Sequence, residues 1–506
     1  MNTDMFYNQK ELEYLLNVNF GDIDGLYDPN INDYFIDIEF KKSILHEAKY
    51  FVIGRKGTGK SALYNWIDRN QVLDGIMVAN KSFNDFPFEK LLQLSDETFA
   101  RPNQYQSIWR NIILTEYAML LCKDQSNPLD NALSELHAYL EYVFGSNLVD
   151  LHKAVTRKSE KSEYGISIKG LSGQVGEGKE IEYYNECKNI TIVNERLNKI
   201  LLDYLMRHET KTYIVQFDQL DDNYTNYVDN DSYIQCIISL FKTIYQLNQI
   251  YRSKGINIKT VAYLRSDIYN KFYRHDPESA RWDQYVLKLN WSIINKNDWF
   301  DSNLLKLINA RIKCSIPELD TQSPFHTIFN KHKIRLMSRN HQEIDIFRFL
   351  IHRTFQRPRD LIQFCIKIQE ECKNSRVLSK KSILNGEKEY SLWLLGEVEN
   401  EIAPIIKDTE SLYELLRLMG RGVYTVSAFK EKYTKFEKRF KDIDVERMLK
   451  LLYEFGIINN IKLKDGVIVE QFSVIRNDRS VFNRDLNIRT HPGFYEGLHT
   501  SKFLSR

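Results

Sequence analysis

The stretch KYFVIGRKGTGKSALYNWI, from Lys49 to Ile67, joins a short apolar run, a glycine-rich turn and a helical pattern. Its centre fits G-x-x-x-x-G-K-[ST], and Ala62 continues it into the helix; the matching residues are Gly54, Arg55, Lys56, Gly57, Thr58, Gly59, Lys60 and Ser61. Small residues let backbone N–H groups close around a phosphate, and the N-terminus of the following helix adds partial positive charge. Lys60 is expected to reach the β- and γ-phosphates, and the Ser61 hydroxyl to bind Mg²⁺. The pattern therefore predicts a nucleotide site.

A second strand ends in acids. The run Thr212 to Phe217 (TYIVQF) is apolar except for Gln216, as expected of a strand buried in a parallel sheet. Asp218 follows it, at the position where a carboxylate beside a phosphate loop helps to hold Mg²⁺; a surface turn is the alternative. Next comes Gln219, where many ATPases have Glu. Asp221 and Asp222 come after Leu220, and a loop there is expected to bring one of these carboxylates toward the γ-phosphate.

Two arginine positions are further candidates. The apolar run Ile256 to Leu264 predicts another buried strand, and Arg265 at its end is placed to contact a γ-phosphate. The alternative is an ordinary surface arginine paired with Asp267. Later, Arg357 and Arg359 flank a proline that suits the first turn of a helix. A cation at that end gains nothing from the helix dipole, so either a function or an ordinary surface position accounts for this pair.

Composition narrows the class of protein. A chain of 506 residues is too long for one ordinary core, and two to four domains are expected. With 70 Lys and Arg against 68 Asp and Glu, the net charge of +2 demands neither nucleic acid nor an anionic membrane. Six cysteines without a C-x-x-C pair indicate no zinc site or disulfide framework. No apolar run approaches the roughly 18 residues of a membrane span. We therefore expect a soluble, cytoplasmic protein without a membrane partner.

The order of elements predicts an α/β fold. Residues 1–48 form a lead-in segment, and residues 49–290 form the nucleotide domain, with Gly75 to Phe83 as a neighbouring strand. Residues from about 100 to 190 are expected to be inserted in that domain. They contain two runs of amphipathic helical spacing and one alternating, glycine-rich run that predicts a β-hairpin or flap: Ser107 to Cys122, Asn131 to Phe144 and Tyr164 to Gly178.

The remainder is expected to form a helical domain at 291–405 and a separate module at 406–506. Three helical segments followed by two strands give the last module the winged-helix pattern, which often binds DNA. Its third helix, however, mixes acids with Arg447 and Lys450. The basic run Lys430 to Lys441 suits either non-specific phosphate contacts or a solvated helical face.

Taken together, the chain resembles bacterial P-loop ATPases of the STAND and AAA-like division. The residues that carry the resemblance are Gly54 to Ser61, Asp218 to Asp222, Leu264 to Asp267, Arg357 to Asp360 and the tail. The resemblance implies a P-loop NTPase parallel sheet with helical insertions, a helical lid and a C-terminal winged-helix domain. It also implies ATP and Mg²⁺ as cofactors, Asp222 and then Asp221 as the water-orienting acid, Arg265 as a sensor and Arg359 as a second sensor.

The leading hypothesis is an ATP-hydrolysing molecular switch. By resemblance, its nucleotide state controls assembly into a homo-oligomer, or an effector protein encoded nearby, as in bacterial antiphage defence. The alternative is a DNA-binding adaptor in which ATP stabilises the fold. A GTP-using protein is disfavoured, because Asn295 to Asp298 matches N-K-x-D ahead of a predicted helix instead of at a strand end.

Overall fold

The computed structural model divides the chain into two compact units. It describes residues 9–38, 40–82, 103, 105–144, 190–221, 230–293, 298–319, 321–329, 333–335, 343–440, 443–477 and 479–499. The first unit comprises Met1–Ile38, Gly57–Gly59 and Asn290–Arg506, and the second comprises Glu39–Lys56 and Lys60–Leu289. The expected lead-in segment is therefore shared between the units. The expected hairpin at 164–178 and the side chain of Asp222 lie outside the described residues.

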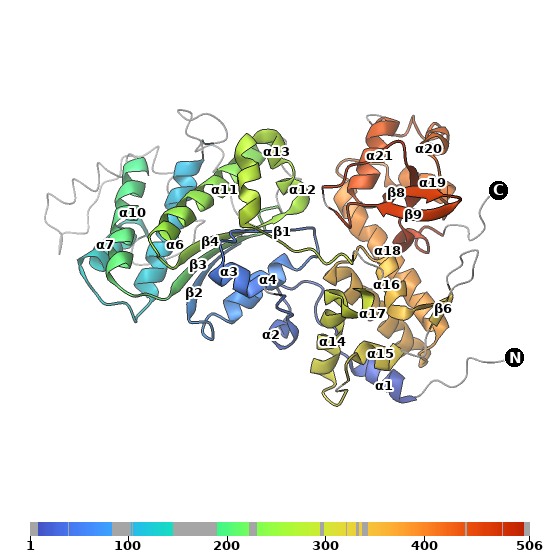
Figure 1. Ribbon diagram of the computed structural model, residues 1–506, viewed down its shortest axis with the longest axis horizontal. Coiled ribbons are helices and arrows are strands. Elements are labelled where there is room, and N and C mark those ends of the chain that lie inside the picture. Colours follow the sequence, from blue (N-terminus) through green and yellow to red (C-terminus); the bar gives the residue numbers. More distant parts are fainter. Residues whose placement is uncertain are drawn as a thin grey trace. The chain divides into compact units, whose positions relative to one another are not determined.

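The second unit is built on a five-stranded parallel sheet (Figure 1). Its strands are β1 (Phe51–Gly54), β2 (Ile76–Ser82), β3 (Thr212–Asp218), β4 (Ile258–Arg265) and β5 (Val286–Lys288). The order is β2-β3-β4-β1-β5, and every adjacent pair is parallel. The predicted α/β class and parallel sheet are confirmed. However, β2 is not a neighbour of β1, because β3 and β4, which come later in the chain, lie between them.

Helices cover both faces of this sheet. Alternate strand residues, such as Phe51, Val215 and Leu264, enter one core with α6, α10 and α11. The other face carries α4 (Lys60–Arg69), whose Tyr64 ring lies edge-on to Tyr263 of β4. Besides α4, the longer helices of this unit are α6 (Gln106–Lys123), α7 (Asn131–Phe144), α10 (Ile190–Arg207) and α11 (Asn230–Ser253). The short elements of this unit are α3 (Phe40–His46), α12 (Ser266–Tyr269), α13 (Phe272–His275) and η2 (Pro277–Tyr285).

Helix α6 differs from its prediction. Its spacing predicts an amphipathic helix in an insertion, but residues around its whole circumference are buried, including Asn111 and Glu116. It packs on β3, α10 and α11, so it belongs to the core of the unit. Glu116 is compensated by Lys81 of β2, with 2.6 Å between the carboxylate and the ammonium. Asn111 and Glu116 have polar partners inside the core, so their presence in the sequence does not indicate a solvent-facing side of the helix.

The first unit is mainly helical. Its helices before residue 406 are α1 (Gln9–Asn17), α2 (Ile31–Tyr34), η3 (Asp298–Asp301), α14 (Asn303–Ser315), α15 (Pro324–Phe329), α16 (Ile346–Arg353), α17 (Pro358–Ser375) and α18 (Lys380–Ile402). The short strands β6 (Lys333–Arg335) and β7 (Glu343–Asp345) form an antiparallel pair. None of the helices in the described ranges has the length and apolarity needed to cross a bilayer.

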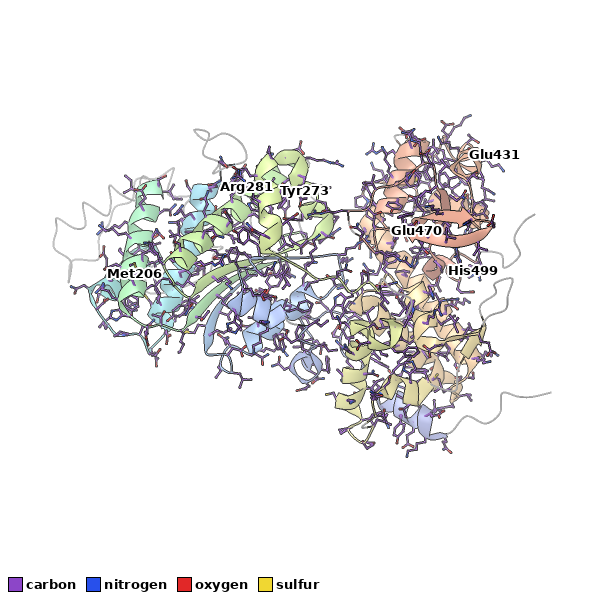
Figure 2. All side chains as sticks on the ribbon, viewed as in Figure 1. Met206, Tyr273, Arg281, Glu431, Glu470 and His499 are labelled. Atoms are coloured by element: carbon purple, nitrogen blue, oxygen red, sulfur yellow. The ribbon has the colours of Figure 1, made fainter. Side chains whose placement is uncertain are left out.

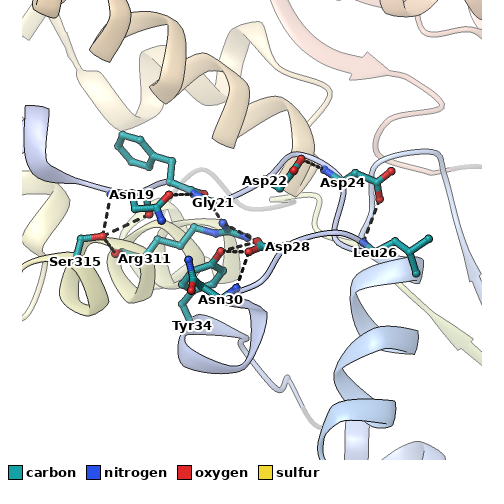
Figure 3. Close-up of polar contacts among 11 residues, drawn as sticks. Asn19, Gly21, Asp22, Asp24, Leu26, Asp28, Asn30, Tyr34, Arg311 and Ser315 are labelled. Carbon is teal, nitrogen blue, oxygen red and sulfur yellow. Dashed lines mark hydrogen bonds and ion pairs between the residues drawn. The ribbon is translucent and has the colours of Figure 1, made fainter.

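The N-terminal residues are fixed to α14 by a buried polar cluster (Figure 3). The Tyr34 hydroxyl donates to the Asp28 carboxylate, and Arg311 of α14 lies 3.6 Å from the same carboxylate. The Arg311 guanidinium also stacks 4.1 Å from the Tyr34 ring centre and donates to the Phe20 carbonyl. Gly21 has φ +76°, and a Cβ there would overlap Arg311. This segment is therefore an integral part of the first unit.

The tail contains α19 (Thr409–Met419), α20 (Val426–Tyr433) and α21 (Val445–Glu454), followed by strands. The hairpin of β8 (Ile458–Lys464) and β9 (Val467–Phe472) was expected, and Glu470 on β9 (Figure 2) pairs with Lys462 at 3.7 Å. A strand that was not predicted, β10 (Asn487–Thr490), pairs with the other edge of β8, and η4 (Pro492–Phe494) follows it. Three helices and a three-stranded antiparallel sheet thus form this module.

Candidate functional site

The glycine-rich loop lies between strand β1 and helix α4, the order of elements that its sequence predicts. Gly57 and Gly59 have φ values of +79° and +92°, a region that L side chains rarely adopt. Lys60 begins α4, and its Nζ donates to the carbonyls of Gly54 and Arg55 at 3.2 and 3.4 Å. Burial lowers the pKa of Lys60, and the nearby Asp221 and Asp218 oppose that effect. The ammonium thus lies within the loop with two carboxylates beside it.

Asp218 is the buried acid of the site. It ends β3, is 2 % exposed, and accepts a hydrogen bond from the Ser61 side chain of α4. Its Oδ2 atom is also buried and has no hydrogen-bond partner among the described residues. Burial raises the pKa of Asp218 to about 6, although the bonds from Gln219 and Ser61 and the charge of Lys60 oppose the rise. The structure therefore brings together the two residues predicted to hold Mg²⁺.

This pair fits a magnesium ion in its chemistry. Mg²⁺ is usually held through one or two carboxylates together with phosphate oxygens and waters. A carboxylate oxygen that is buried and unpartnered is a ligand position, and the Ser61 hydroxyl supplies a second oxygen beside it. In the described part of the chain, no group of three His, Cys, Asp or Glu side chains is arranged to hold a metal by itself.

The residue after Asp218 turns toward β2. Gln219 has φ +60°, an uncommon conformation for a residue with a side chain, and its amide oxygen accepts from the Ser82 hydroxyl. Ser82 ends β2, directly opposite Asp218 in the sheet register. The amide is therefore held at the same edge of the sheet as the predicted metal ligands, in the position where many ATPases have Glu.

Arg265 makes the ion pair with Asp267 that is expected if it is an ordinary surface arginine. Its guanidinium makes two bonds to Asp267, at 3.0 and 2.8 Å, and its Nε lies 3.8 Å from Asp221. Because both acids flank it, a phosphate would have to compete with them for the guanidinium. Asp221 is the one predicted water-orienting acid that the described residues include, and it lies beside Arg265 and Lys60.

The two arginines near α17 have different surroundings. Arg357 is buried and makes a two-pronged ion pair with Asp360, at 2.9 and 2.7 Å, so it stabilises the start of its own helix. Arg359 lies 3.4 Å from Glu397. Within the first unit, the backbone N–H of Arg359 also donates to the Gly57 carbonyl at 3.3 Å, and the Trp291 indole N–H donates to the Thr58 carbonyl at 2.9 Å. Arg359 therefore remains a candidate for phosphate contact, and Arg357 does not.

Sequence reasoning missed a buried polar cluster beneath the loop. Gln216 is fully buried and bonds to α4, β2 and β4 through Tyr64, Asn80 and Tyr263. One signal was available, since Gln216 is the polar residue that interrupts an otherwise apolar strand. Its partners were not apparent, because they depend on the order of strands in the sheet.

Comparison with known proteins first identifies a domain. Residues 302–399, which span α14 to α18, match the FunZ-associated C-terminal helical domain. This region is the one predicted to be a helical lid.

A whole-chain similarity follows. The chain is 22 % identical over 505 residues to a transposon gamma-delta 80.3 kDa protein of Escherichia coli (strain K12), covering 96 % of this chain and 67 % of that protein. Neither description names a nucleotide or a reaction, so the resemblance to STAND ATPases stays a prediction.

Proposed function

We propose that the chain binds ATP with Mg²⁺ at the Gly54–Ser61 loop, hydrolyses it, and acts as a switch whose nucleotide state controls self-assembly or a partner effector. The observation that carries this proposal is the pairing of Ser61 with Asp218, whose second oxygen is buried and has no hydrogen-bond partner in the part of the chain that the structure describes. A buried carboxylate without a partner is costly, and such groups tend to be kept where a ligand completes them. A metal–nucleotide complex would supply the missing charge.

Residues around the loop fit separate roles. Lys60 would exchange its bonds to two loop carbonyls for the β- and γ-phosphates, because a phosphate oxygen is the stronger acceptor for an ammonium. Mg²⁺, when bound, would neutralise charge on the phosphates. Asp221 and Gln219 would face the attacking water, with Asp222 as the acid that the resemblance favours. Arg265 would leave Asp267 in part to contact the γ-phosphate.

The DNA-adaptor alternative depends on the basic run Lys430 to Lys441, in which Lys435 and Lys438 are exposed and three other cations have partners within the module. Lys430 pairs with Glu446, Lys432 donates to the carbonyl of Leu418, and Arg439 contacts Ser411 and Glu414. Each of these cations is therefore at least partly committed within the module. Lys441 lies outside the described residues.

Calorimetric titration with ATP and Mg²⁺ tests the proposal directly. Lys60→Ala should abolish binding, because it removes the cation that faces the β- and γ-phosphates. Lys49→Ala is the matched control: it removes the same charge just before β1, outside the loop, where the ammonium donates to the Gln284 carbonyl at 2.8 Å, and it should retain most of the affinity. Equal affinity of wild type and Lys60→Ala would refute the site.

A further inference from the structure

Gln216 makes an unusual set of contacts for a residue in the middle of a buried strand. Its Nε2 donates to the Tyr64 carbonyl of α4 at 3.3 Å and to Asn80 Oδ1 of β2 at 3.0 Å. Its Oε1 accepts from the Tyr263 hydroxyl of β4. The side-chain amide thus has partners for both ends although it is fully buried. Such a satisfied polar group can fix how its neighbours are arranged.

The position of this amide relates it to the predicted metal ligands. Side chains alternate along a strand, so Gln216 and Asp218 point to the same face of β3, the face covered by α4. Tyr64, whose carbonyl accepts from Gln216, lies one helical turn after Ser61, whose side chain bonds to Asp218. Helix α4 is therefore fastened to β3 at two points, one of which is the candidate metal site itself.

We infer that Gln216 is a positioning residue for magnesium: its amide fastens α4 to β3 so that the Ser61 hydroxyl and the Asp218 carboxylate meet in the geometry that the ion requires. The inference rests on the nucleotide and Mg²⁺ binding proposed above. Mg²⁺ demands near-ideal octahedral geometry, so a small shift of one ligand-bearing element weakens binding. The Gln216 bond thus gives α4 a second polar contact with β3, beside the contact between Ser61 and Asp218.

The test is the magnesium dependence of nucleotide binding. A fluorescent, non-hydrolysable ATP analogue is titrated with Mg²⁺ on the full chain, and the Mg²⁺ concentration for the half-maximal gain in affinity is measured. Gln216→Met, which keeps the length and loses the hydrogen bonds, should raise that concentration about tenfold, as expected from the loss of roughly one hydrogen bond. Its affinity for the analogue in EDTA should stay near that of the wild type. Gln216→Asn, too short to reach Tyr64, should give the same shift and serves if the first variant does not fold.

Tyr263→Phe is the matched control. It removes a hydrogen bond from the same buried amide but leaves the bond between Gln216 and Tyr64, so it should lower stability without changing the magnesium dependence. Equal magnesium shifts in Tyr263→Phe and Gln216→Met would show a merely structural network and overturn the inference. An unchanged Gln216→Met beside a magnesium-dependent wild type would overturn it too. Wild-type protein that binds no analogue at any Mg²⁺ concentration would overturn the proposed function as well.

Discussion

At the scale of single residues, we expect substitution of the acids that follow Asp218 to affect ATP hydrolysis and ATP binding differently. Asp222→Asn should bind Mg²⁺ and ATP as the wild type does, but hydrolyse ATP about 10²-fold more slowly or worse, if this carboxylate orients the attacking water. Phosphate release under single-turnover conditions, with affinity measured in parallel, checks the expectation. Asp221→Asn is the comparison, since Asp221 lies 3.8 Å from Arg265. A slow Asp221→Asn beside a normal Asp222→Asn would move the role to Asp221.

Site residues that lie in one continuous motif could be predicted from the sequence, whereas contacts between distant segments could not. Gly57, Gly59, Lys60 and Ser61 lie in one continuous loop, so pattern and backbone conformation agree. Asp218 could be placed because a buried strand ends there. The contacts of Gln216, and the pairing of Gln219 with Ser82, could not be predicted, because they follow from the placement of β2 beside β3. Which strands become neighbours is decided by packing of the whole unit.

At the scale of elements, α17 and α18 are closely packed at one glycine. A Cβ on Gly386 would lie 2.8 to 3.0 Å from side-chain and backbone atoms of Ile368, so Gly386→Ala should force the helices apart and cost about 1–3 kcal/mol of stability. Gly396, in the same helix, has open space around its missing Cβ. Gly396→Ala should therefore stabilise the protein by up to about 1 kcal/mol through helix propensity.

Urea denaturation of both glycine variants, compared with the wild type, measures this difference. Opposite shifts of the midpoint are expected. Equal shifts would mean that the close approach of the two helices does not limit the residue at position 386.

Buried strands could be predicted from the sequence more reliably than the surroundings of α6 or the pairing of β10. Continuous apolar runs such as Thr212 to Phe217 predicted buried parallel strands correctly, because such strands have no polar face. The prediction that α6 has a solvated polar face was wrong, because Asn111 and Glu116 are buried in pairs with Asn194 of α10 and Lys81 of β2. Strand β10 is four residues long and alternates only briefly, so its pairing with β8 is a tertiary effect.

At the scale of the whole molecule, a buried histidine should make stability depend on pH. His491 is 4 % exposed, lies against the Phe355 ring, and accepts a hydrogen bond from the Gly493 N–H through Nδ1. Burial lowers its pKa to about 3, with help from Arg489, His352, Arg353 and Arg357. In the unfolded chain, histidine takes up a proton near pH 6.5. The unfolded state therefore gains protons first, and stability falls as the pH drops from 6.5 toward 3.

His491→Asn keeps an acceptor for Gly493 but cannot be protonated. Between pH 7 and pH 5, the wild type should lose about 2 kcal/mol more of its free energy of unfolding than this variant does. Urea denaturation at the two pH values measures the difference. His499→Asn, at a surface histidine (Figure 2), should follow the wild type. A His491→Asn protein with the wild-type pH dependence would contradict the assignment.

The proposed switch predicts a nucleotide-dependent change in the molecule. A γ-phosphate held by Lys60 and Arg265 would give the ATP state contacts that the ADP state lacks, and such a difference is what shifts a population. Mass and small-angle scattering should therefore differ between ADP and a non-hydrolysable ATP analogue. Arg265→Ala should erase the difference while keeping most of the affinity. Identical mass and scattering in both states would leave ATP as a structural ligand.

The buried cluster of Asp28, Tyr34 and Arg311 has a consequence for synthesis. Helix α1 and the segment after it are translated before the second unit, but their packing partners, α14, α15 and α17, are translated only after it. At about 5–20 residues per second, an interval of roughly 300 residues lasts about 15–60 s. During that time Leu15, Phe20 and Ile31 stay exposed on the nascent chain. The parallel sheet of the second unit, which is translated next, can already fold. We therefore expect the first unit to close after the second, and residues 9–38 to be the part of the nascent chain that a chaperone holds.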